Sequence, residues 1–177
     1  MLIFLLIILK EPNMPEADCS CAPSSQCKCN EMGLTSIPEN LPTSIKLLNL
    51  ASNQITTIQK GSFQKLPMLV YLNLCGNKIT MIQAGTFQNL PRLNKLLLHK
   101  NQITTIQRHA FRNLPRLEKL FLSHNKIQLV NFANLPRLAQ LYLDNNNITA
   151  ITSHTFENLP RLQVLDLRYN ELSPDNM

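Results

Sequence analysis

Residues 93–116 read LNKLLLHKNQITTIQRHAFRNLPR, and close variants of this stretch recur along most of the 177-residue chain. The copies begin at Ile45, Leu69, Leu93, Leu117, Leu138 and Leu162. Their spacing is 24 residues, except that the fifth copy starts 21 residues after the fourth. A fixed period of this length predicts a solenoid, in which each copy forms one coil and stacks on its neighbours.

The apolar positions of each copy predict how one coil folds. Each copy follows the pattern L-x-x-L-x-L-x-x-N-x-I/L, so its second and third leucines lie two residues apart and point inward from a short strand. Further along, isoleucine and phenylalanine recur at Ile58, Ile82, Ile106 and Ile151 and at Phe63, Phe87, Phe111 and Phe156. Such a coil is apolar on both flat faces, which only stacking can cover. The strands then form a parallel sheet on the concave side.

An asparagine follows the strand of every copy, at Asn53, Asn77, Asn101, Asn125, Asn146 and Asn170. These side chains stand where the chain turns a corner and backbone groups lose their sheet partners. A buried carboxamide can donate and accept at once, so we expect a buried, hydrogen-bonded ladder. The alternative is a functional role for the aligned asparagines, such as a track that binds glycans.

The fourth copy is shorter than the others. Val130 and Phe132 are two positions apart, whereas Ile106 and Phe111 in the third copy are five positions apart. The missing residues fall on the convex return stretch, where length changes cost little free energy. We therefore expect a local change of curvature and no lost strand.

Four of the five cysteines lie close together near the N-terminus, at Cys19, Cys21, Cys27 and Cys29. This cluster predicts a disulfide-bonded knot and hence an oxidising compartment. A zinc knot is the alternative, although the Cys-x-Cys spacing and the lack of a nearby histidine differ from common zinc sites. Cys75 stands apart and is expected to be an unpaired surface thiol, or else the partner in an intermolecular disulfide.

Residues 30–44 read NEMGLTSIPENLPTS and join the cysteine cluster to the first copy. Together with the repeats, this segment resembles the N-terminal cap of extracellular leucine-rich-repeat proteins. That family includes Toll-like receptors, Slit proteins, small leucine-rich proteoglycans and variable lymphocyte receptors. The likeness covers residues 19–172 and implies an α/β solenoid. This solenoid would be a right-handed, curved horseshoe with a parallel concave sheet and an irregular or 3-10 helical convex side.

The resemblance also implies a cysteine pairing, Cys19 with Cys29 and Cys21 with Cys27. The cap departs from the family pattern, because the usual upstream cysteine is absent and Cys27 appears instead. From the residues alone, three pairings of the four cysteines stay open.

We expect four segments along the chain. Residues 1–18 hold an apolar run, LIFLLIIL, that suits a signal peptide, although no basic residue precedes it and no clear cleavage site follows. A truncated N-terminus is the alternative. Residues 19–44 form the cap, and residues 45–172 form five full repeats and a partial sixth. The tail, residues 173–177, carries no closing cap, so we expect a fragment of a longer chain whose membrane attachment lies outside it, or a dimer joined through open ends.

The concave face supplies the first candidate binding site, because the outward positions of its strands are not required by the repeat. Its members are Tyr71, Lys95, Leu97, His99, Lys119, Phe121 and Tyr142. The neighbouring Leu97, Phe121 and Tyr142 form an apolar row of the kind that marks interaction surfaces. The lysines and His99 beside this row would attract an acidic rim on a partner.

A basic edge supplies the second candidate. Its members are Arg92, Arg108, Arg112, Arg116, Arg137 and Arg161. With a net charge of +6, this edge suits a polyanion such as a sulfated glycan. The alternative is that duplication copied Pro-Arg-Leu and that the charges are only solvated.

Other motifs complete the functional hypothesis. Asn147 begins an N-glycosylation sequon, which fits secretion. No phosphate loop, hydrolase elbow, zincin helix or nucleotide fingerprint occurs, and the histidines lack a metal-binding arrangement, so we expect no enzyme, no cofactor, no metal and no nucleic-acid partner.

The sequence therefore predicts a secreted protein or a cell-surface ectodomain that binds a protein or glycan on its concave face. This recognition module would be innate-immune-receptor-like or guidance-like. The alternative is a structural matrix protein that binds collagen or sulfated glycosaminoglycan through the basic edge.

Overall fold

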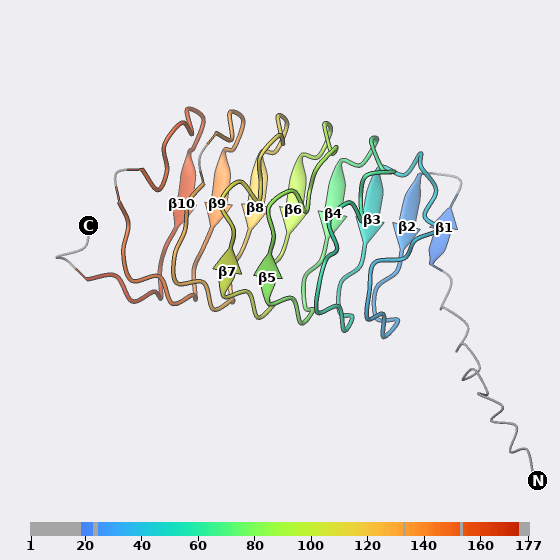
Figure 1. Ribbon diagram of the computed structural model, residues 1–177, viewed down its shortest axis with the longest axis horizontal. Coiled ribbons are helices and arrows are strands. Elements are labelled where there is room, and N and C mark those ends of the chain that lie inside the picture. Colours follow the sequence, from blue (N-terminus) through green and yellow to red (C-terminus); the bar gives the residue numbers. More distant parts are fainter. Residues whose placement is uncertain (1–18, 23–24, 133, 153, 174–177) are drawn as a thin grey trace, which may run out of the picture.

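The computed structural model describes residues 19–22, 25–132, 134–152 and 154–173. The coils stand in a single row, with the cap at one end and the last repeat at the other (Figure 1). The expected leader, residues 1–18, and all of the tail except Ser173 lie outside the described residues.

One sheet runs the length of the row. In spatial order its strands are β1 (Ser20–Ala22), β2 (Gln26–Lys28), β3 (Leu47–Asn49), β4 (Tyr71–Asn73), β6 (Lys95–Leu97), β8 (Lys119–Phe121), β9 (Gln140–Tyr142) and β10 (Val164–Asp166). All neighbouring pairs from β2 to β10 are parallel, and β1 is antiparallel to β2. Each repeat contributes one strand in the same register, so the expected parallel sheet is confirmed, including the strand of the shortened fourth repeat.

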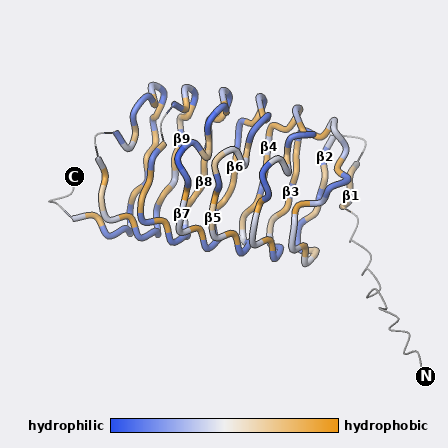
Figure 2. Tube along the Cα trace, in the orientation of Figure 1, coloured by the Kyte–Doolittle hydropathy of each residue, from blue (hydrophilic) through white to orange (hydrophobic). Residues whose placement is uncertain are grey.

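The core is a column of leucines behind this sheet. In β6, Leu96 is fully buried while its neighbours Lys95 and Leu97 are half-buried, and the same alternation recurs in β3, β4, β8 and β9. Each fully buried leucine contributes about 2 kcal/mol through the apolar area it removes from water. Figure 2 shows the hydrophobic stretches returning at the same place in successive coils.

A second column, of phenylalanines, fills the space behind the leucines. The rings of Phe63 and Phe87 are stacked with centroids 6.0 Å apart, Phe87 and Phe111 are 5.8 Å apart, and Phe111 and Phe132 are 5.9 Å apart. Phe132 therefore keeps its place in the column although its repeat is shorter. Phe156, in the next coil, is only partly buried.

The convex side is irregular, as expected, but it is not helical. The described residues include a two-stranded parallel sheet, β5 (Met81–Ile82) with β7 (Thr105–Ile106), and no helix of either kind. Single turns occur there, as where the Gln64 amide donates to the Gly61 carbonyl at 2.9 Å. Of the two forms expected, irregular or 3-10 helical, the structure therefore shows the irregular one.

The asparagine ladder joins successive coils. The Asn101 carboxamide nitrogen donates to the carbonyls of Leu98 in its own coil (3.0 Å) and Leu74 in the preceding coil (2.9 Å). Its oxygen accepts from the Ile79 amide at 3.1 Å. The ladder residues Asn53, Asn77, Asn101, Asn125 and Asn146 are only 6% to 8% exposed. They are therefore occupied in the core, and the hypothesis of a glycan-binding track is wrong.

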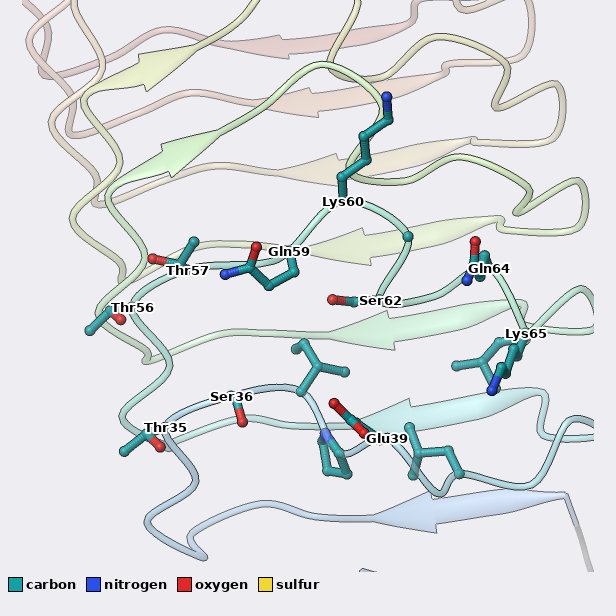
Figure 3. Close-up of a pocket in the computed structure, with 15 residues that line it drawn as sticks. Thr35, Ser36, Glu39, Thr56, Thr57, Gln59, Lys60, Ser62, Gln64 and Lys65 are labelled. Atoms are coloured by element: carbon teal, nitrogen blue, oxygen red, sulfur yellow. The ribbon is translucent and has the colours of Figure 1, made fainter.

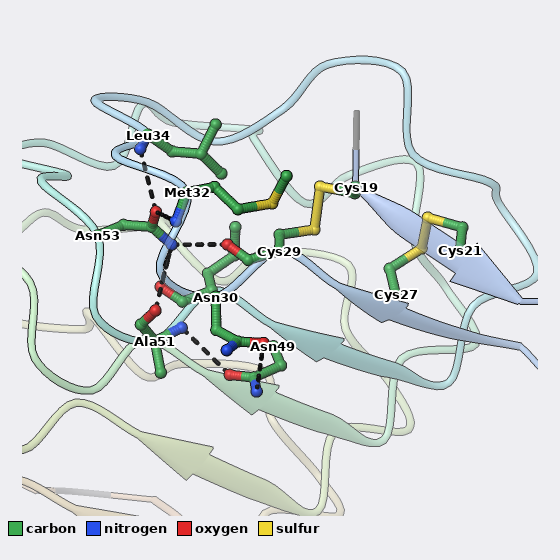
Figure 4. Close-up of a disulfide and its surroundings, with 11 residues drawn as sticks. Cys19, Cys21, Cys27, Cys29, Asn30, Met32, Leu34, Asn49, Ala51 and Asn53 are labelled. Atoms are coloured by element: carbon green, nitrogen blue, oxygen red, sulfur yellow. Dashed lines mark hydrogen bonds between the residues drawn. A yellow bond between two sulfur atoms is a disulfide. The ribbon is translucent and has the colours of Figure 1, made fainter. Parts of the chain in front are cut away.

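The cap continues the solenoid rather than standing apart from it. Disulfides join Cys19 to Cys29 and Cys21 to Cys27, which confirms the pairing implied by the family and excludes the zinc knot (Figure 4). β2 pairs with β3, so the cap covers the first leucine coil. Asn53 adds a hydrogen bond between the first repeat and the cap, because its carboxamide nitrogen donates to the Cys29 carbonyl at 2.7 Å.

The two ends of the row differ. In β9 Leu141 is fully buried, whereas in β10 Val164 is 38% exposed and Leu165 is 37% exposed. The apolar flank of β10 thus lies open where the earlier coils are covered. Among the residues that the structure describes, none forms a helix long and apolar enough to cross a bilayer.

Candidate ligand-binding face

The strand register brings most of the predicted concave residues into two adjacent columns. Tyr71, Lys95 and Lys119 are register partners on β4, β6 and β8. Leu97, Phe121 and Tyr142 are register partners on β6, β8 and β9. Parallel neighbours lie about 4.8 Å apart, which is close enough for each side chain to touch the next. We call these residues, with His99, the concave patch.

The two aromatic residues of the second column stack directly on each other. The Phe121 and Tyr142 rings are 4.7 Å apart between centroids and only 9° from parallel. Each ring is half-buried, as is Leu97, so the apolar row on the concave face is partly exposed. Stacking covers part of each ring and leaves one flat, rigid platform instead of separate exposed side chains.

Lys95 links the two columns. Its ammonium nitrogen lies 5.5 Å from the centroid of the Tyr71 ring and 5.2 Å from the centroid of the Phe121 ring. Both distances allow cation–π attraction. The sequence predicted Lys95 beside the apolar row, but not that its charge would lie over two rings. The patch is thus a continuous surface from Tyr71 through Lys95 to Tyr142.

His99 closes one side of the patch. Its ring lies 6.3 Å from that of Phe121, tilted by 60°. Burial lowers the pKa of His99, and the positive charges of Lys100, His124 and Lys95 lower it further. Its Nδ1 atom is buried and has no hydrogen-bond partner among the described residues. A neutral imidazole with an unpaired nitrogen is an unused hydrogen-bonding group at the edge of the patch.

Cys75 lies on the strand side next to Tyr71 and is a free thiol, half-buried. Burial raises the pKa of the Cys75 thiol, and nearby Lys100 offsets this only in part. Burial also raises the pKa of Tyr71, with a smaller contribution from Cys75. Both groups therefore stay protonated at neutral pH, which makes Cys75 a poor nucleophile. Cys75 forms no disulfide within this chain, and the alternative of an intermolecular disulfide stays a prediction.

The basic edge lies apart from the concave patch. All six of its arginines, from Arg92 to Arg161, are exposed. Two of them, Arg108 and Arg112, also line a convex cavity of about 430 Å³. Whether the edge binds a polyanion stays a prediction.

The glycosylation prediction at Asn147 also stays open. Asn147 is half-buried, and its carboxamide nitrogen donates to Glu171 Oε1 at 2.7 Å. This nitrogen is the atom to which a glycan would be attached. Glu171 is exposed, so the contact lies at the surface and Glu171 can move aside.

Sequence reasoning missed the cavities of the convex side. One, of about 520 Å³, lies between the cap and the first repeat and is walled by polar side chains that include Thr57, Gln59 and Ser62 (Figure 3). No periodic pattern points to such a cavity, because it forms between return stretches of differing length. The shortened fourth repeat is the one sequence feature that could have pointed to the cavity at Arg108.

The histidines were not expected to form a metal site. Nowhere in the described part of the chain do three histidine, cysteine, aspartate or glutamate residues gather closely enough to hold a metal ion. The Nδ1 atom of His154 lies 3.4 Å from the Oε2 atom of Glu157.

Sequence comparison finds leucine-rich repeats throughout this region. The "Leucine rich repeat" family profile matches residues 34–79, 68–127 and 136–175, and a two-copy profile matches residues 115–155. Biglycan of Xenopus laevis is 50% identical over 42 residues, which are 24% of this chain and 11% of biglycan. Leucine-rich repeat-containing G-protein coupled receptor 4 of Bos taurus is 36% identical over 58 residues, which are 33% of this chain and 6% of that receptor. The matches therefore span only a small part of either relative, and neither name denotes an enzyme.

Two solved structures share the fold. The complex of TLR13 with ssRNA13 superposes with a TM-score of 0.67 at 32% identity, over 70% of this chain and 19% of that one. Human 5T4, a trophoblast glycoprotein also called Wnt-activated inhibitory factor 1, superposes with a TM-score of 0.64 at 26% identity, over 93% of this chain and 74% of that one.

Proposed function

This chain belongs to the leucine-rich-repeat family, and we propose from that premise that it is an extracellular recognition module whose concave patch binds a protein or glycan ligand. The observation that carries the proposal is the platform of stacked Phe121 and Tyr142 beside Lys95. Rigid aromatic groups lose little conformational entropy on binding, which is why they dominate the energetics of many interfaces. Lys95 adds a positive charge at the edge of an apolar surface and favours a ligand with an acidic rim.

The extracellular assignment rests on the cap. Two disulfides within residues 19–29 persist in oxidising surroundings and are rare in the cytosol. A receptor among the relatives and a glycoprotein among the structural neighbours support the same location. We propose a secreted protein or a cell-surface ectodomain with an innate-immune-receptor-like or guidance-like role, no catalytic activity and no cofactor.

The test is a comparison of binding profiles on arrays of extracellular proteins and glycans. We expect Phe121→Ala and Tyr142→Ala each to weaken the binding that the wild-type chain shows by about tenfold or more, as for central aromatic residues of interfaces. Neither ring lies in the buried leucine or phenylalanine column, so the thermal unfolding midpoint should change little.

The matched control is Leu129→Ala, which removes an apolar side chain that is 71% exposed and lies on the return stretch. This variant should bind as the wild type does. Unchanged binding by both patch variants would place the ligand elsewhere on the molecule.

The alternative function is that of a matrix protein that binds collagen or sulfated glycosaminoglycan through the basic edge. The exposure of all six arginines favours it. Binding through exposed charges weakens steeply as salt is added, whereas binding to the concave patch should depend less on salt. A salt series on the same arrays therefore separates the two functions.

We propose no nucleic-acid partner for this chain, although one structural neighbour was solved in complex with a single-stranded RNA. A secreted, disulfide-capped protein meets protein and glycan ligands more readily than free RNA. A single-stranded RNA oligonucleotide belongs in the binding test, and tight, salt-resistant binding of it would contradict this part of the proposal.

A further inference from the structure

The shortened fourth repeat leaves a hollow on the convex side. Only Asn131 separates Val130 from Phe132, whereas four residues, 107–110, fill the same interval in the third repeat. The cavity at this place has a volume of about 430 Å³ and is walled by the third, fourth and fifth coils. We call this cavity the notch.

Backbone hydrogen bonds hold the notch open on one side. The Phe132 amide donates to the Thr155 carbonyl at 2.9 Å, and the Asn134 amide donates to the Glu157 carbonyl at 3.4 Å. The side chains of Asn158 and Asn134 are also bonded, at 3.3 Å. The short return stretch of the fourth coil is thus tied forward to the fifth coil, while the longer stretch of the third coil forms the opposite wall.

The floor of the notch is apolar and closed. Phe111 is 5% exposed, Phe132 is 1% exposed and Leu135 is fully buried. The two rings are stacked in the core column, so they cannot move to fill the hollow. These side chains form the closed base of the notch but scarcely reach solvent, so a ligand would meet mainly the polar and charged side chains of the walls.

The walls of the notch are cationic. Arg108, Arg112, His109 and His154 line it, and Glu157 is its one acidic residue. Glu157 lies 3.4 Å from His154, so its carboxylate faces an imidazole. Neither the Arg108 nor the Arg112 guanidinium forms a hydrogen bond or ion pair with another described residue, which leaves both free for an anion.

We propose that the notch binds an anionic saccharide unit, with its sulfate or carboxylate group on Arg108 and Arg112. Guanidinium groups pair with such oxyanions through two parallel hydrogen bonds. Asn131 and Asn134 line the same walls and can donate to or accept from sugar hydroxyls. The volume falls within the usual range of small-ligand pockets, roughly 300–1,000 Å³. This site is separate from the concave patch and does not depend on it.

The first test uses a heparin-derived tetrasaccharide and its fully desulfated counterpart, with sialyllactose and lactose as the carboxylate pair. Titration calorimetry on the full chain should detect binding of at least one anionic sugar and little binding of its uncharged partner. Arg108→Gln with Arg112→Gln should weaken that binding by about tenfold or more. The control, Lys46→Gln with Lys126→Gln, removes the same charge from exposed positions outside the notch, the basic edge and the concave patch, and should change it by less than about twofold.

The second test fills the notch without removing any charge. Insertion of Gln-Ala-Gly between Val130 and Asn131 restores the spacing that Ile82 and Phe87 have in the second repeat. This variant should lose the anionic sugar while it keeps both arginines and the concave patch. Phe121→Ala should leave binding of the anionic sugar to the notch unchanged. The proposal for the notch and the proposal for the concave patch can therefore fail independently of each other.

Four results would overturn the inference. The first is equal weakening by the arginine pair and the control pair, which would indicate general electrostatic attraction. The second is full affinity after the insertion. The third is that none of the sugars binds. The fourth is that a single-stranded RNA or a phosphopeptide binds more tightly at the same arginines.

Discussion

Asn101 joins three backbone groups that belong to two coils. Its carboxamide serves the carbonyls of Leu74 and Leu98 and the amide of Ile79, and all of these contacts are buried. Water cannot replace such a side chain, because the site is closed on every side. Asparagine is therefore needed at the ladder positions for its hydrogen bonds and not for the size of its side chain.

We expect Asn101→Ala to lower the free energy of unfolding by about 3 kcal/mol or more, since it leaves several buried polar groups without partners. Asn101→Asp keeps the acceptor and loses the donors, so it should also destabilise. Urea denaturation followed by circular dichroism measures both variants. A loss below about 1 kcal/mol for Asn101→Ala would mean that water enters the corner.

His99 should make stability depend on pH. Its pKa is lower in the folded chain than its ordinary value of about 6.5, because burial and nearby cations disfavour the charged imidazole. As the pH falls through that value, the unfolded chain takes up a proton first, so stability is full above it and decreases below it. Since His99 is half-exposed, solvent screening should keep the effect below about 1 kcal/mol.

The measurement is the unfolding midpoint of the wild type and of His99→Gln at pH 7.5 and pH 5.5. The wild type should lose more stability between the two values than the variant does. Equal losses would show that His99 titrates as an exposed histidine.

At the scale of elements, the sequence predicts strands and register well because both follow from spacing. Leu48, Leu72 and Leu96 occupy the same position in successive copies, and the structure pairs them in that order. The cap pairing was implied by family resemblance and is confirmed. These features depend on chain connectivity and on which positions are apolar, and both are visible in a single sequence.

Side-chain arrangement across coils was harder to predict. Periodicity places Lys95 beside Phe121, but the rotamer that carries its ammonium over two rings depends on neighbours in other coils. The same reason explains why Phe121 and Tyr142 are half-buried rather than open. For the convex side the sequence predicted an irregular or 3-10 helical form, and the structure shows the irregular one, with single turns.

At the scale of the whole molecule, the stacked coils leave one apolar flank open, at β10. Leu165 is 37% exposed, although its equivalents Leu141 and Leu120 are fully buried. An open strand edge with apolar side chains can pair with the same edge of another copy.

We expect a polypeptide that ends at Met177 to self-associate in a concentration-dependent way, and Leu165→Lys in that polypeptide to reduce this association. Sedimentation velocity over a range of concentrations measures the change. Val70→Lys, which alters an apolar residue that is 39% exposed in a covered part of the row, is the matched control. Association that is unaffected by Leu165→Lys would show that the edge of β10 is not the contact.

The ladder also gives the solenoid a direction of assembly. The Ile55 amide is satisfied by Asn77, and the Ile79 amide by Asn101, so each turn of the chain is completed by a side chain that follows it in sequence. A ribosome releases the cysteine-rich end first, and every newly emerged turn then stacks on the turn before it and supplies the asparagine that completes that turn. The last folded turn always has a backbone amide without its partner, because the asparagine that will accept from it has not yet been translated. Synthesis and folding can therefore advance in the same direction, one turn at a time.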